Sequence, residues 1–243
     1  MCAVRSPRSV ARFVLLIAIA VCGFGGLVAY RWVERHPEHV PWAPLTLEQP
    51  VGRFTPLKLE RMRSDFAACR AILDEAGIAY RALPLVDVDE TCGYADGVRL
   101  AADDGIDYSP AVAASCVVAA GLWLWERDIV GPAAMRHFGR PVTGITTFGT
   151  YACRRIGGGS RGRFSEHASA NAIDIAAFTL EGGQQLSIAS DWNSGGAEAA
   201  FLREVRDGAC QIFGTTLSPD YNAAHHDHLH LDQTPRGGFT VCR

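Results

Sequence analysis

The sequence predicts an α+β domain in which helices flank an antiparallel sheet, preceded by one membrane-spanning helix. Helix-like and strand-like apolar patterns follow each other along the chain without a repeated beta-alpha-beta rhythm, which is typical of this fold class. A single long apolar run lies near the N-terminus. The 243 residues are enough for one domain of about 200 residues and a short appendage.

The apolar run extends without interruption from Phe13 to Tyr30. About 18 apolar residues at a rise of 1.5 Å come close to spanning the hydrocarbon core of a bilayer. Basic residues before the run favour a cytoplasmic N-terminus; they are Arg5, Arg8 and Arg12. We therefore expect residues 1–12 in the cytoplasm, an uncleaved anchor at 13–32 and the domain on the other side. A cleaved signal peptide is the alternative, although no small-x-small cleavage site follows the apolar core.

Residues 33–56 are rich in proline and are expected to form a linker that lifts the domain from the membrane. Trp42, Leu45 and Leu47 within it can still pack on the domain. Beyond residue 36 the charge balance is about −7, which does not favour a nucleic-acid partner.

Six cysteines follow the anchor, an even number that fits three disulfides in an oxidising compartment. Six buried thiols or a cysteine-bound metal are the alternatives, but the chain has no Cys-x-x-Cys pair. The six candidates are Cys69, Cys92, Cys116, Cys153, Cys210 and Cys242, and the sequence does not choose among their pairings.

The domain itself is expected to occupy residues 57–243. Apolar spacing and the following Gly77 predict an amphipathic helix over 57–76. A short strand is expected over 83–88, a buried helix from Pro110 to Trp125, and a strand from Val142 to Tyr151. Alternation of side chains predicts another strand from residue 172, and apolar spacing predicts a helix over 197–213.

Two histidine-containing stretches converge on a metal site in this interpretation. Asp174 projects opposite the flanking isoleucines of its strand, seven residues after His167, and His228, His230 and Asp232 share one face of a later strand. Two imidazoles and a carboxylate suit one zinc ion with an open position for water, so His167, Asp174 and His230 are the predicted ligands.

The predicted general base is His228, which lies two residues before a ligand on the same face. Asp227 is the rival: a regular strand would turn it away, so it can act only if the strand begins after it. His225 and His226 are assigned to a loop, and Glu166 is expected to be solvated.

These residues resemble a known zinc signature. Ser-x-His-x6-Asp followed by His-x-His is similar to that of the D-alanyl-D-alanine peptidases and murein endopeptidases of the Hedgehog/DD-peptidase fold, and the bacterial extensin-like C-terminal domain family within that superfamily resembles this chain most closely. The resemblance covers roughly residues 43–243. Its motifs are residues 151–154 (Tyr-Ala-Cys-Arg), 165–167 (Ser-Glu-His), 201–203 (Phe-Leu-Arg), 217–222 (Leu-Ser-Pro-Asp-Tyr-Asn), the histidine cluster and the closing Cys-Arg.

The resemblance implies roles for further residues. Arg154, in a Tyr-Arg element beside the metal, would hold a substrate carboxylate or the developing oxyanion, with Tyr151 as a second substrate contact; a surface arginine is an equal alternative for Arg154. Ser165 would either cap the following segment or bind a substrate carboxylate. Asp232 would orient one of the histidines from outside the metal shell, although a surface salt bridge is an equal alternative.

Together these inferences predict a zinc-dependent metallopeptidase anchored in the bacterial inner membrane by a single span, with its domain in the periplasm. Its expected substrates are the stem peptides or cross-links of peptidoglycan, by resemblance to the superfamily. The alternative is a non-catalytic module that binds peptidoglycan or a protein. The intact ligand set argues against that alternative.

Overall fold

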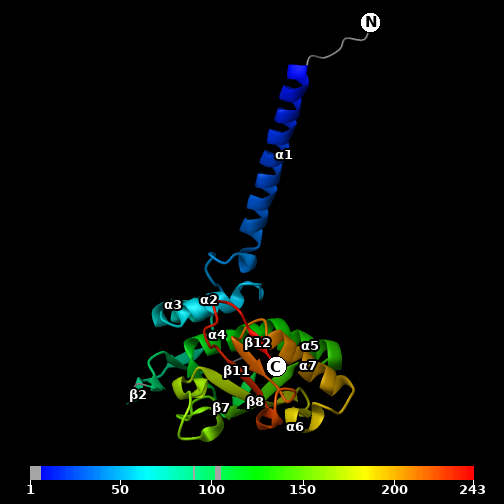
Figure 1. Cartoon of the computed structure of the whole chain (residues 1–243). Helices are drawn as coiled ribbons and strands as arrows, with labels where there is room; N and C mark the ends of the chain where they lie inside the picture. Colours follow the sequence, from blue (N-terminus) through cyan, green and yellow to red (C-terminus); the bar gives the residue numbers. More distant parts are fainter. Residues whose placement is uncertain (1–6, 90, 102–104) are drawn as a thin grey trace.

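The computed structural model describes residues 7–89, 91–101 and 105–243. Figure 1 shows one long helix, α1 (Pro7–Arg35), projecting from a domain of helices and sheets. Between Ala11 and Arg35 this helix is long and apolar enough to cross a membrane, and none of that length is buried. It continues past the expected end at residue 32. Residues 1–6 of the expected cytoplasmic tail, with Arg5, lie outside the described residues.

A seven-stranded sheet forms the centre of the domain. Its strands are β5 (Asp107–Ser109), β7 (Val142–Gly149), β8 (Ala172–Leu180), β9 (Gln185–Ser187), β10 (Thr215–Leu217), β11 (Leu229–Asp232) and β12 (Val241–Cys242). They lie in the order β12-β10-β11-β8-β7-β5, and β9 pairs with β8. The central pairings are antiparallel, as predicted, whereas β5 and β12 run parallel to their neighbours at the two edges.

Two smaller sheets and a set of helices complete the α+β domain. One sheet has the order β1-β4-β6 and the other pairs β2 with β3; the strands are β1 (Tyr80–Ala82), β2 (Val86–Asp89), β3 (Cys92–Tyr94), β4 (Gly97–Leu100) and β6 (Ala113–Ser115). The α-helices are α2 (Thr55–Met62), α3 (Phe66–Glu75), α4 (Cys116–Trp125), α5 (Gly131–Phe138), α6 (Ile188–Asp191) and α7 (Ala197–Ala209). Short helical turns are η1 (Pro37–His39), η2 (Glu126–Val130, a π-helix), η3 (Ile156–Gly158), η4 (Glu166–Ser169) and η5 (Ala223–His225).

The core lies between the central sheet and helices α4, α5 and α7. Trp125 of α4 and Phe201 of α7 pack against Phe178 of β8, with ring centroids 5.8 and 5.2 Å away. The indole nitrogen of Trp125 donates to the Val205 carbonyl at 2.8 Å, so the only polar atom of that side chain is satisfied inside the core.

A β-bulge in β8 separates its apolar face from its polar one. Thr146 pairs with Ala177 and Thr147 with Ile175, so Ala176 is an extra residue in the ladder. The extra residue shifts the alternation by one position, which places Phe178 on the same face as Ile175. Asp174 therefore projects from the opposite face, away from the core.

Several element boundaries differ from those predicted. The helix expected over 57–76 is two helices, because Asp65 accepts a hydrogen bond from the Ala68 amide at 2.9 Å and caps a new helix there. Of the strand expected over 83–88, only residues 86–88 are extended, as the start of β2, since β1 already ends at Ala82. The segment opened by Pro110 forms β6 before it becomes α4, and α7 ends at Ala209 rather than at residue 213.

The proline-rich segment packs on the domain. Val40 and Leu47 are buried, and the Lys58 ammonium donates to the Pro37 carbonyl at 2.7 Å. The Val51 amide donates to the Asp128 carboxylate at 2.8 Å. Since both side chains and backbone of this segment are engaged, it holds the domain close to the end of α1 instead of separating the two.

All six predicted cysteines form disulfides. The pairs are Cys69–Cys116, Cys92–Cys153 and Cys210–Cys242. The first joins α3 to α4 within the core. The second joins β3 to the segment that follows β7, and the third joins the end of α7 to β12.

Candidate metal centre

Three side chains from two strands and one helical turn meet beside β7. His230 of β11 lies directly opposite Asp174 of β8 in the antiparallel ladder, so backbone register alone brings these two side chains together. His167 lies on η4, just before β8. Ala170 ends η4 in the left-handed region at φ 53°, which turns the chain sharply into the strand.

The ligand atoms of these three residues form a compact triangle. His167 Nε2 lies 3.2 Å from Asp174 Oδ1 and 3.2 Å from His230 Nδ1, and His230 Nδ1 lies 2.9 Å from Asp174 Oδ1. Donors in a tetrahedral zinc site, each about 2.0–2.1 Å from the ion, lie about 3.3 Å apart. All three residues are buried, and the group could hold a metal ion.

Outer hydrogen bonds fix which ring nitrogen of each histidine faces the triangle. His167 Nδ1 donates to the Thr150 carbonyl at 2.7 Å, and His230 Nε2 donates to Asp232 Oδ2 at 3.0 Å. Both partners are acceptors, so both of these nitrogens carry protons. In the neutral rings the lone pairs of His167 Nε2 and His230 Nδ1 then point at the Asp174 carboxylate. Three acceptors facing one another fit a cation between them.

In the metal-free protein, the pKa values of Asp174 and His230 likewise favour a positive charge within the triangle. Burial opposes ionisation of Asp174, but hydrogen bonds from His167 and His230 outweigh it and hold its pKa well below the usual range. Burial likewise opposes protonation of His230, yet the Asp174 and Asp232 carboxylates raise its pKa to about 9. A proton occupies the triangle when no metal does, so metal binding must displace it.

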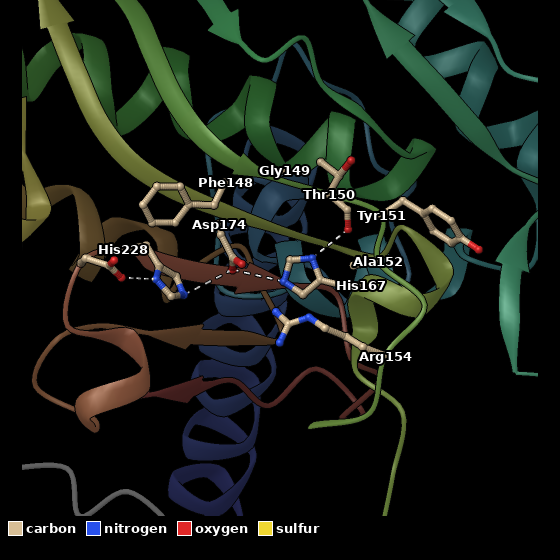
Figure 2. A pocket seen from close by; sticks show the side chains of 10 residues that line it. Phe148, Gly149, Thr150, Tyr151, Ala152, Arg154, His167, Asp174 and His228 are labelled. Atoms are coloured by element: carbon tan, nitrogen blue, oxygen red, sulfur yellow. Dashed lines mark hydrogen bonds and ion pairs between the residues drawn. The ribbon is translucent and has the colours of Figure 1, made fainter. Parts of the chain in front are cut away.

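The triangle opens onto a pocket of about 330 Å³. Figure 2 shows His167, Asp174 and His228 in a row among the residues that line this pocket, with Phe148 at one side. A second bulge, in β7, makes Phe148 the extra residue between Thr147 and Gly149, and the side chain of Phe148 is exposed at the rim.

The two candidate bases form a hydrogen-bonded pair at this pocket. His228 Nδ1 lies 2.8 Å from Asp227 Oδ1, and His228 Nε2 lies 3.6 Å from Asp174 Oδ1. Both residues line the pocket. β11 begins at Leu229, so the condition under which Asp227 can face the site is met.

The other predicted residues divide into two groups. Arg154 lines the pocket with an exposed side chain, and its guanidinium in Figure 2 points toward His167 and Asp174. Tyr151 contributes to the wall, but its ring points away from the triangle and packs edge-on against Tyr94 at 5.4 Å. Ser165 accepts a hydrogen bond from the His167 amide at 3.3 Å, the capping arrangement.

Sequence reasoning missed His225. It lies on η5, with its ring centroid 5.2 Å from that of His228 and 6.0 Å from that of His230. Burial, together with the nearby His228 and His230, lowers the pKa of His225 to about 4, so the ring is neutral. The sequence feature that could have indicated His225 is the high density of histidines over 225–230. The turn η5 places the ring of His225 close to those of His228 and His230.

Glu166 also differs from its prediction as a solvated residue. Its carboxylate accepts a hydrogen bond from the Asn171 amide group and lies 3.8 Å from the Arg63 guanidinium. Glu166 therefore braces η4, the turn that carries His167, against α2 and the start of β8.

Comparison with known proteins identifies the family. The family model described as Extensin-like protein C-terminus matches residues 67–243. Comparisons with the curated proteins and with the solved structures gave no match. The matched region contains the metal-ligand triangle, the pocket and all three disulfides. The chain belongs to the extensin-like protein C-terminus family.

Proposed function

We propose that this protein is a membrane-anchored periplasmic zinc metallohydrolase, a peptidase that cleaves stem peptides or cross-links of peptidoglycan. The observation that carries the proposal is the triangle of His167, Asp174 and His230, of which His167 and Asp174 line an open pocket together with the Asp227–His228 pair. Three protein ligands and an accessible fourth position are the arrangement of catalytic rather than structural zinc.

Each residue at the pocket has a definite part in amide hydrolysis. A bound zinc ion would supply Lewis acidity and lower the pKa of a water molecule toward about 7. His228 accepts the proton of the attacking water at Nε2, because Asp227 holds the proton of the other ring nitrogen at 2.8 Å. The Asp227 carboxylate is the alternative acceptor. The same base then returns the proton to the departing amine.

Arg154 is the group best placed to bind the negative charge of the substrate. Its side chain is exposed and points toward the ligand triangle. A guanidinium binds a carboxylate or a developing oxyanion through paired hydrogen bonds, and either is present in hydrolysis of a peptide near its C-terminus. Tyr151 contributes through its place in the wall, and Ser165 through the cap that holds His167.

The anchor and the disulfides together support the proposed periplasmic location. An apolar helix long enough to span a membrane precedes a domain with three disulfides, which persist in an oxidising compartment. The peptidoglycan substrate is the expectation drawn from the superfamily that the chain resembles.

The test is metal content followed by digestion. The full chain, purified in detergent with its disulfides formed, is assayed for zinc and then incubated with purified peptidoglycan, and the released fragments are identified by mass. We expect one equivalent of zinc and cleaved stem peptides. His167→Ala and His230→Ala should lose both, whereas His137→Ala should lose neither, because His137 pairs with Glu204 and does not line the pocket. Full cleavage by His167→Ala would refute the metal assignment, and zinc without products would favour the binding module.

A further inference from the structure

The end of α1 is fastened to the domain by a short, well-packed segment. The Trp32 ring stacks on that of His39 and lies tilted against that of His36, with centroids 6.1 and 5.1 Å away. Immediately afterwards Glu38 and Val40 are buried in the domain. Because this connection is packed rather than flexible, one particular face of the domain stays beside the end of α1, as Figure 1 shows for α2 and α3.

This face carries the two most exposed large apolar side chains among the residues whose exposure the structure describes. Phe239 is 80% exposed and Trp42 is 77% exposed. Trp42 follows Pro41, whose carbonyl accepts a hydrogen bond from Arg61 of α2 at 2.5 Å. At this exposure, neither the tryptophan nor the phenylalanine side chain contributes appreciable apolar burial to the stability of the fold.

Phe239 belongs to the same face although it is distant in sequence. The Glu60 carboxylate of α2 accepts hydrogen bonds from the amides of Arg236 and Gly238, at 2.9 and 3.1 Å. Gly238 also lines a hollow of about 290 Å³ together with His39 and Arg53 from the fastening segment. Figure 1 shows the red C-terminal segment reaching α2 where α1 ends.

Three arginines of this part of the chain, Arg35, Arg53 and Arg61, are exposed. Of the acidic groups, Glu38 is buried against His36 and Glu60 accepts the two amides described above, whereas Glu34, Glu48 and Asp65 are exposed. Tryptophan and exposed basic residues together are the composition found at the headgroup level of membranes, and basic residues favour anionic lipids.

We propose that this face rests on the headgroup layer of the membrane that α1 crosses and binds anionic phospholipid there. The membrane-facing surface consists of Arg35, Trp42, Arg53, Arg61 and Phe239. The domain then lies on the bilayer in a fixed orientation. This proposal rests on α1 spanning the membrane and does not depend on zinc or on any peptidase activity.

Photocrosslinking in lipid nanodiscs tests this surface. The full chain carries a benzophenone amino acid at position 42 or 239, with position 156 as the matched control, because Ile156 is 64% exposed on η3. Figure 1 shows this yellow-green segment on the side of the domain far from α1. We expect lipid adducts at 42 and 239 and at least tenfold fewer at 156.

The lipid and the arginines are varied next. Adducts at 42 and 239 should fall several-fold when phosphatidylglycerol is replaced by phosphatidylcholine, or when Arg53→Gln and Arg61→Gln are combined. Equal adduct yields at 42, 239 and 156, or a chain that does not remain in the disc, would overturn the proposal. Zinc content and peptidoglycan digestion, measured on the same samples, show independently whether the proposed function holds.

Discussion

Replacing Asp232 by Asn should weaken zinc binding 10–100-fold without unfolding the domain. Asp232 Oδ2 accepts the hydrogen bond of His230 Nε2 at 3.0 Å, while Oδ1 accepts that of the Thr234 amide at 2.8 Å. In the variant the Thr234 amide keeps the single remaining oxygen, so the new amino group faces His230 Nε2. Two donors then oppose each other.

The conflict is relieved only if His230 moves its proton to Nδ1, the atom that lies 2.9 Å from Asp174 Oδ1 and faces the metal position. That tautomer cannot donate a lone pair to zinc. The expected loss of affinity corresponds to about 1.4–2.7 kcal/mol. His230→Ala, which removes the ligand itself, should mark the lower limit of affinity.

Competition with a chromophoric zinc chelator at fixed pH measures this affinity in the full chain. Asp207→Asn is the matched control, because Asp207 pairs with Arg206 on α7 and its side chain is 64% exposed. The control should bind zinc as tightly as the unaltered protein. If Asp232→Asn binds zinc within twofold of that value, the hydrogen bond to His230 does not set the tautomer and our description of the site is wrong.

Three further changes probe the base, a buried acid and a disulfide. His228→Ala should keep zinc and lower kcat at least 100-fold, whereas Asp227→Ala should lower kcat by a smaller factor. If a peptide-release assay shows the larger fall in kcat for Asp227→Ala, Asp227 is the base. Burial raises the pKa of Glu126 from 4.5 to about 7, although the hydrogen bond that the Tyr108 hydroxyl donates to it opposes the shift. The folded protein therefore loses stability as pH rises from about 4.5 to 7, and Glu126→Gln should gain about 1–3 kcal/mol at pH 8 but little at pH 4.5, as urea unfolding would show. Replacing Cys210 and Cys242 together by serine opens a loop of 32 residues and should cost about 3–4 kcal/mol, measured in the same way; an unchanged midpoint would contradict the loop-entropy estimate.

The meeting of Asp174 and His230 was predictable because each lies in a regular strand pattern. Alternation places Asp174 opposite Ile173 and Ile175, and the antiparallel ladder then aligns it with His230. Local reasoning could not supply the β-bulges at Ala176 and Phe148, since a bulge depends on how neighbouring strands pair. Without the first bulge Phe178 would leave the core, so tertiary packing selects a geometry that the strand pattern does not contain.

The errors in the prediction arise where side chains pair over long distances in sequence. The proline content of residues 33–56 indicates an extended chain, but Leu47 joins the hydrophobic core and Leu45 packs against it, and that contact decides their position. Glu166 was predicted to be solvated because the sequence does not show that the fold brings Asn171 and Arg63 beside it. Disulfide pairing was likewise open, because cysteine spacing carries no information about which helices meet.

The rigidity of the site differs between the ligands and the base. Asp174 and His230 are in paired positions of two central strands, and His167 is held at Thr150 and through the cap of η4. Asp227 and His228 come from the segment before β11, where no ladder fixes the backbone. In the proposed mechanism, ligands on paired strands would keep their geometry, whereas a base in a loop could follow the proton from the attacking water to the leaving amine. For this reason substitutions at the base should separate turnover from metal binding, while substitutions at the ligands should remove both.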